Sequence, residues 1–155
     1  MADQFRILNL IALEALCLLR KKKLKLLPKT RNLYLGRWDR VEVDKRQFDK
    51  ICSTKELAPM SIEIIRAFDD MSDHLHYHDE AYAVTVILGK TEGYDEPVGC
   101  QVHYKSDKPI PAMSGVTLQI PPNTIHSFSG GKKPITFLSV QSKKIEKDYH
   151  HVRGK

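Results

Sequence analysis

Cysteine is scarce in this sequence of 155 residues, which contains only Cys17, Cys52 and Cys100, none of them close to another. The odd count and the wide spacing exclude a disulfide framework and a zinc finger built from cysteine pairs. Because disulfides belong to oxidising compartments, we expect a reducing, cytoplasmic location. The chain also lacks the composition of a disordered protein, since 41% of it is hydrophobic and 28% is charged. We therefore expect one globular domain.

Apolar runs long enough to span a membrane are missing as well. The apolar stretch at residues 7–19 is interrupted by Asn9 and Glu14, and it is shorter than the roughly 20 residues that a spanning helix needs. The strongest positive cluster follows this stretch instead of preceding it, and no small-x-small cleavage site appears. These features argue against a secretory signal and predict no contact with a membrane.

Positive charge is in excess only near the N-terminus. Residues 1–50 carry 13 Lys+Arg and 6 Asp+Glu, whereas the other 105 residues carry 12 and 13. A near-neutral C-terminal part is not typical of a nucleic-acid-binding domain, so we expect no nucleic-acid partner. The basic run Arg20–Lys25 is interpreted as a solvated helix end, where cations suit the helix dipole. The alternative is contact with an anionic partner.

The N-terminal residues predict an amphipathic helix that Pro28 ends, and we assign residues 1–31 to this extension. Apolar side chains recur at helical spacing, while Arg6, Asn9 and Arg20 fall on the opposite side. The apolar face has to be buried, either against the rest of the chain or against a second copy of it. The apolar positions are Phe5, Leu8, Ile11, Ala12, Ala15, Leu18 and Leu19.

Short strands separated by turn residues fill the rest of the chain. They are predicted at 32–43, 61–68, 82–88, 99–104, 116–120 and 135–141, with a weak helix or loop at 45–57. Many short strands at this spacing favour a barrel or sandwich over alternating strands and helices. We place this domain at residues 32–145 and a basic tail at 146–155. His150 and His151 of the tail are expected to have no special role.

Three histidines alternate at His74, His76 and His78, followed by Glu80 and Tyr82. Alternate residues of a strand point to one face, so all five side chains can share a face. Imidazole with carboxylate is a good ligand set for zinc, iron, manganese or nickel.

A second stretch has matching spacing: Gly115, then Pro121 and Asn123 in a tight turn, then His126 at the start of a strand. Together the two stretches resemble the metal-binding motifs of the cupin family, over about residues 60–142. Asn123 stands where the family has a turn glycine, and Asn is the next most tolerant residue for a left-handed position. The resemblance implies an all-β cupin double-stranded β-helix (a jelly-roll barrel), here with an N-terminal α-helical extension.

The first motif fits the resemblance in two registers. In one register His74 and His76 are the ligand pair and Glu80 is the carboxylate, but the following glycine comes two residues late. In the other, His76 and His78 are the pair, the glycine falls on time and Tyr82 takes the Glu position. The sequence leaves both open, with His76 and His126 belonging to each.

The expected site holds one divalent metal ion, Fe²⁺ first, with Zn²⁺, Mn²⁺ or Ni²⁺ as alternatives. A three-His or three-His-one-Glu set leaves coordination positions open, which favours an enzyme acting on a small molecule. We expect a non-haem iron dioxygenase-type oxidoreductase with Tyr82 or Glu80 as acid or base. The alternatives are a metal-dependent isomerase or lyase and a non-catalytic ligand-binding or sensor module. Apolar strand residues are expected to line the cavity, and the resemblance makes a homodimer the default.

Overall fold

The computed structural model describes residues 2–29, 38–52, 60–67, 75–89, 100–104, 110–112, 115–130, 135–143 and 147–152. Within them lie two helices and eleven strands. The helices are α1 (Ala2–Arg20) and α2 (Lys45–Ile51). The strands are β1 (Leu26–Lys29), β2 (Trp38–Val43), β3 (Ser61–Ala67), β4 (His76–Tyr77), β5 (Ala83–Gly89), β6 (Cys100–Tyr104), β7 (Ile110–Ala112), β8 (Thr117–Ile120), β9 (His126–Gly130), β10 (Ile135–Gln141) and β11 (His150–His151).

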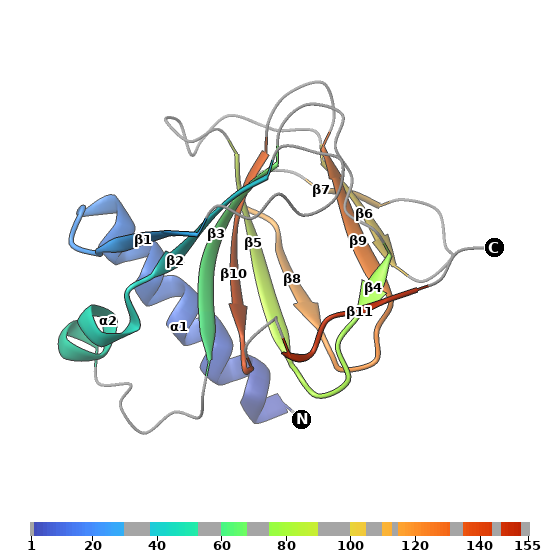
Figure 1. Cartoon of the computed structure of the whole chain (residues 1–155), viewed down its shortest axis with the longest axis horizontal. Helices are drawn as coiled ribbons and strands as arrows, with labels where there is room; N and C mark the ends of the chain where they lie inside the picture. The colour runs from blue at the N-terminus through green and yellow to red at the C-terminus, as the bar shows by residue number, and fades with distance from the viewer. Residues whose placement is uncertain are drawn as a thin grey trace.

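The strands form two antiparallel sheets that face each other (Figure 1). One sheet has the order β1-β2-β3-β10-β5-β8 and the other has the order β11-β4-β9-β6-β7. From β3 onward the chain crosses repeatedly from one sheet to the other, which is how a double-sheet jelly roll is built. This arrangement confirms the all-β barrel with an added N-terminal helix. The predicted strands at 61–68, 82–88, 116–120 and 135–141 correspond closely to β3, β5, β8 and β10.

Helix α1 covers the outer face of the six-stranded sheet, running behind β3, β10 and β5 in Figure 1. The apolar face of α1 is therefore buried against the barrel of the same chain, which is the first of the two alternatives considered above. The helix contributes Leu8, Ile11, Ala12, Ala15 and Leu18, all at most 6% exposed. They pack against outward-facing residues of the sheet, Ile62, Val84, Val86, Leu88, Leu138 and Val140. Burial of this much apolar surface is the main force that holds α1 in place.

The end of α1 differs from the prediction. The helix ends at Arg20, and Lys22 has a left-handed backbone with φ of 51°. The Lys22 N–H donates to the carbonyl of Leu19 and the Lys23 N–H to that of Leu18, which is the Schellman arrangement. Pro28, expected to end the helix, lies in β1 at the edge of the sheet, where a missing N–H is tolerated. Among the residues described, no helix is both long and apolar enough to cross a bilayer.

The inner face of the six-stranded sheet is more polar than expected. Its apolar members Ala83, Ile87 and Phe137 pack with Phe128 of the opposite sheet. Buried polar side chains occupy other positions of the same strands on this face: Ser61, Glu63, Thr85, Ser139 and Gln141, each at most 6% exposed. This inner face is therefore mixed, with the apolar walls that we expected at Ile65, Ile87, Ile120 and Phe137 and polar side chains between them. Polar residues alternate with apolar ones here because the Val and Leu residues of β5 and β10 face α1 on the other side of the sheet.

Candidate metal centre

Three histidine side chains come together in the five-stranded sheet. His76 lies on β4 directly opposite His126 of β9, and His78 follows β4 by one residue. Their ligand nitrogens all lie within 4.8 Å of one another, and the three residues are 2–4% exposed. The ring centroids of His76 and His126 are 4.3 Å apart, and that of His78 lies 5.3 Å and 5.4 Å from them. This buried triad can hold a metal ion.

Two rings of the triad are oriented by main-chain carbonyls. His126 Nδ1 lies 2.8 Å from the carbonyl oxygen of Thr124, and His78 Nδ1 lies 2.5 Å from that of Asp148. A carbonyl only accepts hydrogen bonds, so each Nδ1 must carry the proton and donate it. The lone pair of each ring is then on Nε2, which is the nitrogen that can act as a metal ligand.

The electrostatics of His126 also suit a ligand. Burial lowers the pKa of His126 from 6.5 to about 4, the hydrogen bond to Thr124 opposes this, and nearby His78 lowers the pKa further. The imidazole is therefore neutral at physiological pH, which is the form that binds metals. The donor set of three buried imidazoles thus fits a divalent ion such as Fe²⁺ or Zn²⁺.

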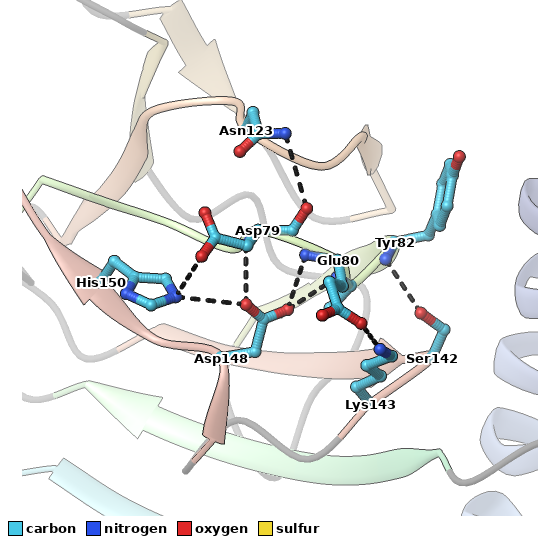
Figure 2. Close-up of polar contacts among 9 residues, drawn as sticks. Asp79, Glu80, Tyr82, Asn123, Ser142, Lys143, Asp148 and His150 are labelled. Carbon is cyan, nitrogen blue, oxygen red and sulfur yellow. Dashed lines mark hydrogen bonds and ion pairs between the residues drawn. The ribbon is translucent and has the colours of Figure 1, made fainter.

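The structure brings together the histidines of the second register, while His74 lies outside the described residues. Glu80 is on the surface, with its side chain 65% exposed and its carboxylate ion-paired with Lys143 (Figure 2). Tyr82 is half-buried and its ring packs edge-on against Phe5 of α1, with centroids 5.4 Å apart. It therefore belongs to the cluster on the outer face of the sheet. We assign neither residue a catalytic role from these positions.

A bend after His78 separates Glu80 and Tyr82 from the histidines. The backbone N–H groups of Asp79, Glu80 and Ala81 all donate to the carboxylate of Asp148, at 2.7, 3.0 and 2.7 Å (Figure 2). Successive N–H groups of a strand point to opposite sides, so three in a row toward one acceptor require a bent chain. The sequence predicts a strand from His74 to Tyr82 in which alternate side chains share a face. This alternation does not continue beyond His78.

Asn123 forms the tight turn before His126. It has a φ of 60°, which confirms the left-handed position inferred from its place in the motif. Its backbone N–H donates to the carbonyl of His78, at 2.6 Å. The turn that precedes one histidine of the triad is thus hydrogen-bonded to another, which helps to hold β4 and β9 in register.

The C-terminal residues complete the surroundings of the triad. The ring of Tyr149 stacks on His76 with centroids 4.2 Å apart and planes 20° apart, and it meets His78 edge-on at 5.7 Å. Strand β11 pairs with β4, with His151 opposite His76. His150 Nε2 lies 3.0 Å from the Asp79 carboxylate and 3.4 Å from that of Asp148. Residues 147–152, predicted as part of a tail, thus lie against the histidines.

No motif in the sequence points to Asp148 or Tyr149. The contact between Asp148 and His78 spans 70 positions, and a strand of two residues has no periodicity to detect. The one available signal is that Asp148-Tyr149-His150-His151 interrupts an otherwise basic stretch with aromatic and acidic residues.

Comparison with known proteins supports the fold. No family model matches the chain, and no curated protein matches its sequence. Solved structures do match, among them the polyketide cyclase RemF from Streptomyces resistomycificus, with a TM-score of 0.60, 12% identity, and coverage of 84% of this chain and 82% of RemF. PAC13 from Streptomyces, solved with uridine, gives a TM-score of 0.53 and 14% identity over 85% of this chain and 86% of PAC13.

The chain is also similar to part of a longer protein. The capsular polysaccharide assembling protein CapF from Staphylococcus aureus matches with a TM-score of 0.54 and 10% identity, over 84% of this chain. The chain spans about a third of the length of CapF, since only 35% of that protein is covered. At such identities the likeness concerns the fold. Together with the two facing sheets, it identifies the chain as a protein of the cupin fold, a double-stranded β-helix, with an α-helix added at the N-terminus.

Proposed function

We propose that the chain binds one divalent metal ion between His76, His78 and His126 and uses it to transform a small polar molecule. The first reaction class to test is oxygenation with Fe²⁺, by a dioxygenase-type oxidoreductase. The observation that carries the proposal is the buried triad, whose ligand nitrogens lie within 4.8 Å of one another. Three protein ligands leave coordination positions open, which is typical of catalytic metal sites and not of structural ones.

A bound metal would supply Lewis-acid chemistry or, in the case of iron, one-electron chemistry with dioxygen. The protein residues have a different task, which is to hold the ligand nitrogens in place. Thr124 and Asp148 keep the protons of His126 and His78 on Nδ1, which puts the lone pair of each ring on Nε2, the metal-binding nitrogen. Burial of the three rings limits access of bulk water, which strengthens the electrostatic interactions inside the site.

The polar inner face of the six-stranded sheet supports a substrate with hydrogen-bonding groups. Gln141 is 4% exposed, and its Oε1 atom has no hydrogen-bond partner within the described part of the chain. A buried acceptor without a partner costs free energy unless a water or a ligand satisfies it. Ser139 and Thr85 lie side by side across β10 and β5 on the same face. These groups suit a small molecule with hydroxyl or amide donors better than a hydrocarbon.

The enzyme proposal is compatible with the fold, which also hosts other chemistries. RemF is described as a polyketide cyclase, and a zinc or manganese ion in the same triad would favour isomerase or lyase chemistry through polarisation of a carbonyl or hydroxyl. Fold alone does not choose among these reactions or exclude a non-catalytic binding module. The identity of the metal separates them.

Reconstitution with single metals tests the proposal. The metal-free protein is loaded with Fe²⁺, Zn²⁺, Mn²⁺ or Ni²⁺, and oxygen uptake and substrate loss are followed with a panel of small hydroxylated, amide and keto compounds. We expect turnover with Fe²⁺ and oxygen uptake that disappears in His126→Ala. Turnover with Zn²⁺ or Mn²⁺ and no oxygen uptake would replace the dioxygenase by an isomerase or lyase. Metal binding with no turnover for any compound would favour the binding module.

Two further predictions about partners are still to be tested. Association into a homodimer is expected from the fold, and light scattering of the full chain gives the mass that decides it. Contact with nucleic acid or membranes through the basic run Arg20–Lys25 is not expected. Binding assays with duplex DNA and anionic vesicles check this second prediction.

A further inference from the structure

The C-terminal segment, residues 147–152, contacts the metal centre through one buried acidic residue. Asp148 is 6% exposed, and its carboxylate accepts three hydrogen bonds from the consecutive N–H groups of Asp79, Glu80 and Ala81 (Figure 2). A carboxylate is buried at an acceptable cost only when its charge is compensated in this way. The three hydrogen bonds fix the path of the chain immediately after His78.

The same residue also holds the His78 ring directly. The main-chain carbonyl of Asp148 accepts the hydrogen bond from His78 Nδ1. Asp148 therefore binds the stretch 78–81 twice, by its carbonyl at the ring and by its carboxylate at the backbone. Groups that hydrogen-bond the far nitrogen of a metal-binding imidazole fix its tautomer and direction, and their loss typically lowers metal affinity by roughly 10- to 100-fold.

The next residue supports a second histidine of the triad. Tyr149 stacks on His76 and meets His78 edge-on, so its ring contacts two of the three imidazoles. The segment is fastened to the strand of His76 on the other side as well, because the Val152 N–H donates to the carbonyl of Leu75 and β11 pairs with β4. Asp148 and Tyr149 thus restrain His78 and His76 from one short piece of chain.

From this geometry we infer that residues 147–152 form a positioning element of the metal centre, in which Asp148 orients His78 and the ring of Tyr149 supports His76. The inference rests on the proposed metal binding. Its new claim is that the metal centre is complete only when residues 147–152 are docked against the barrel. Because docking favours the metal-binding arrangement, bound metal must in turn stabilise the docked segment.

Substitution of Asp148 provides the first test. Asp148→Asn keeps the shape of the side chain and the main-chain carbonyl, but it replaces one acceptor oxygen by a donor that faces the N–H groups at 79–81. With the hydrogen bonds to residues 79–81 weakened, the main-chain carbonyl of Asp148 is no longer held against His78 Nδ1. We therefore expect the affinity for Zn²⁺, measured by competition with a chelator, to fall roughly 10- to 100-fold. The visible spectrum of the Co²⁺ form should also change, because the direction of a ligand changes; a loss of stability alone would leave that spectrum intact.

Asp79→Asn is the matched control. It makes the same chemical change one residue after His78, but the Asp79 side chain is 51% exposed and its carboxylate pairs with His150. We expect its Zn²⁺ affinity to stay within about 3-fold of the wild-type value, since exposed ion pairs are weak. If Asp79→Asn and Asp148→Asn lose the same Zn²⁺ affinity, the affinity depends on negative charge near the site and not on the hydrogen bonds of Asp148. That result would overturn the inference.

Tyr149 is tested by a pair of variants that does not depend on how Asp148→Asn folds. Tyr149→Phe keeps the ring and should keep the wild-type affinity, whereas Tyr149→Ala removes the ring and should lower the affinity about 10-fold. If Tyr149→Ala binds Zn²⁺ as the wild type does, the supporting role of the ring is wrong.

A measurement on the metal-free protein separates failure of the inference from failure of the proposed function. Nitrogen-15 NMR reads the tautomer of His78, which should be Nδ1–H in the wild type and a mixture of both tautomers in Asp148→Asn. A wild type that binds no metal but shows this difference would refute the metal-dependent function and keep the positioning role. The same single tautomer in both proteins would refute the positioning role whatever the metal result.

Discussion

Helix α1 and the C-terminal segment 147–152 both pack against the barrel, but on different sheets and by different interactions. The helix buries apolar side chains such as Leu8 and Ile11 against the six-stranded sheet. The segment contacts the five-stranded sheet through the carboxylate of Asp148 and the ring of Tyr149. Apolar burial is nondirectional and supplies stability. Hydrogen bonds and stacking are directional, so they are suited to fixing the geometry of a site.

The largest expected effect disrupts the apolar contact of α1. Ala15 is 0% exposed, so Ala15→Glu places a charge in the interface between α1 and the sheet. Since a buried charge without a partner is very costly, we expect a loss of more than about 3 kcal/mol in the free energy of unfolding, or failure to fold. Urea unfolding measures it.

The control for this substitution lies on the same helix. Leu13 is 60% exposed, so Leu13→Glu should change the free energy of unfolding by less than about 0.5 kcal/mol. Equal losses in the two variants would show that α1 does not pack by its predicted apolar face.

The second largest effect concerns acid stability at the metal centre. The pKa of His126 is 6.5 in the unfolded chain and about 4 in the folded protein. Between these values the unfolded chain binds more protons, so stability is present above pH 6.5 and is lost as the pH falls toward 4. We expect the metal-free protein to lose about 2 kcal/mol between pH 7 and pH 5 from this residue. Urea unfolding of the wild type and His126→Gln measures the difference, and parallel pH curves would contradict it.

A smaller effect of opposite sign is expected at the end of α1. Lys22 has a φ of 51°, a conformation that glycine adopts without strain. Lys22→Gly should therefore raise the free energy of unfolding, by up to about 1 kcal/mol. A lower value would mean that Lys22 contributes a contact that outweighs its backbone strain. Thermal unfolding is sufficient to detect the change.

The smallest effect is expected at the exposed ion pair beside the C-terminal segment. Lys143 pairs with Glu80, but the two side chains are 49% and 65% exposed. Solvent screens such pairs, so Lys143→Ala should change stability by less than about 0.5 kcal/mol and leave metal affinity unchanged. A clear loss of metal affinity would indicate that Glu80 takes part in the site after all.

The parts of the structure that depend on repetition could be predicted from the sequence. The helical spacing of apolar residues predicts the buried face of α1. Short apolar runs bounded by turn residues predict β5 and β10. The turn at Asn123 and the pairing of His76 with His126 follow from motif spacing.

The parts that depend on single hydrogen bonds could not be predicted. The end of α1 is set by a left-handed Lys22, a residue without the usual preference for that conformation. The surface position of Glu80 follows from the bend at residues 79–81, whose N–H groups donate to the carboxylate of Asp148. The contact of Asp148 with His78 spans 70 positions, and no local pattern in the sequence indicates it.

Metal content per chain tests the central claim most directly. Protein purified without a histidine tag is analysed by mass spectrometry after reconstitution, beside His126→Ala and the control Lys143→Ala, whose exposed side chain lies outside the triad. The account predicts about one metal ion per chain in the wild type and Lys143→Ala and none in His126→Ala. Full metal content in His126→Ala, or no metal in the wild type, would contradict a metal centre at these three histidines.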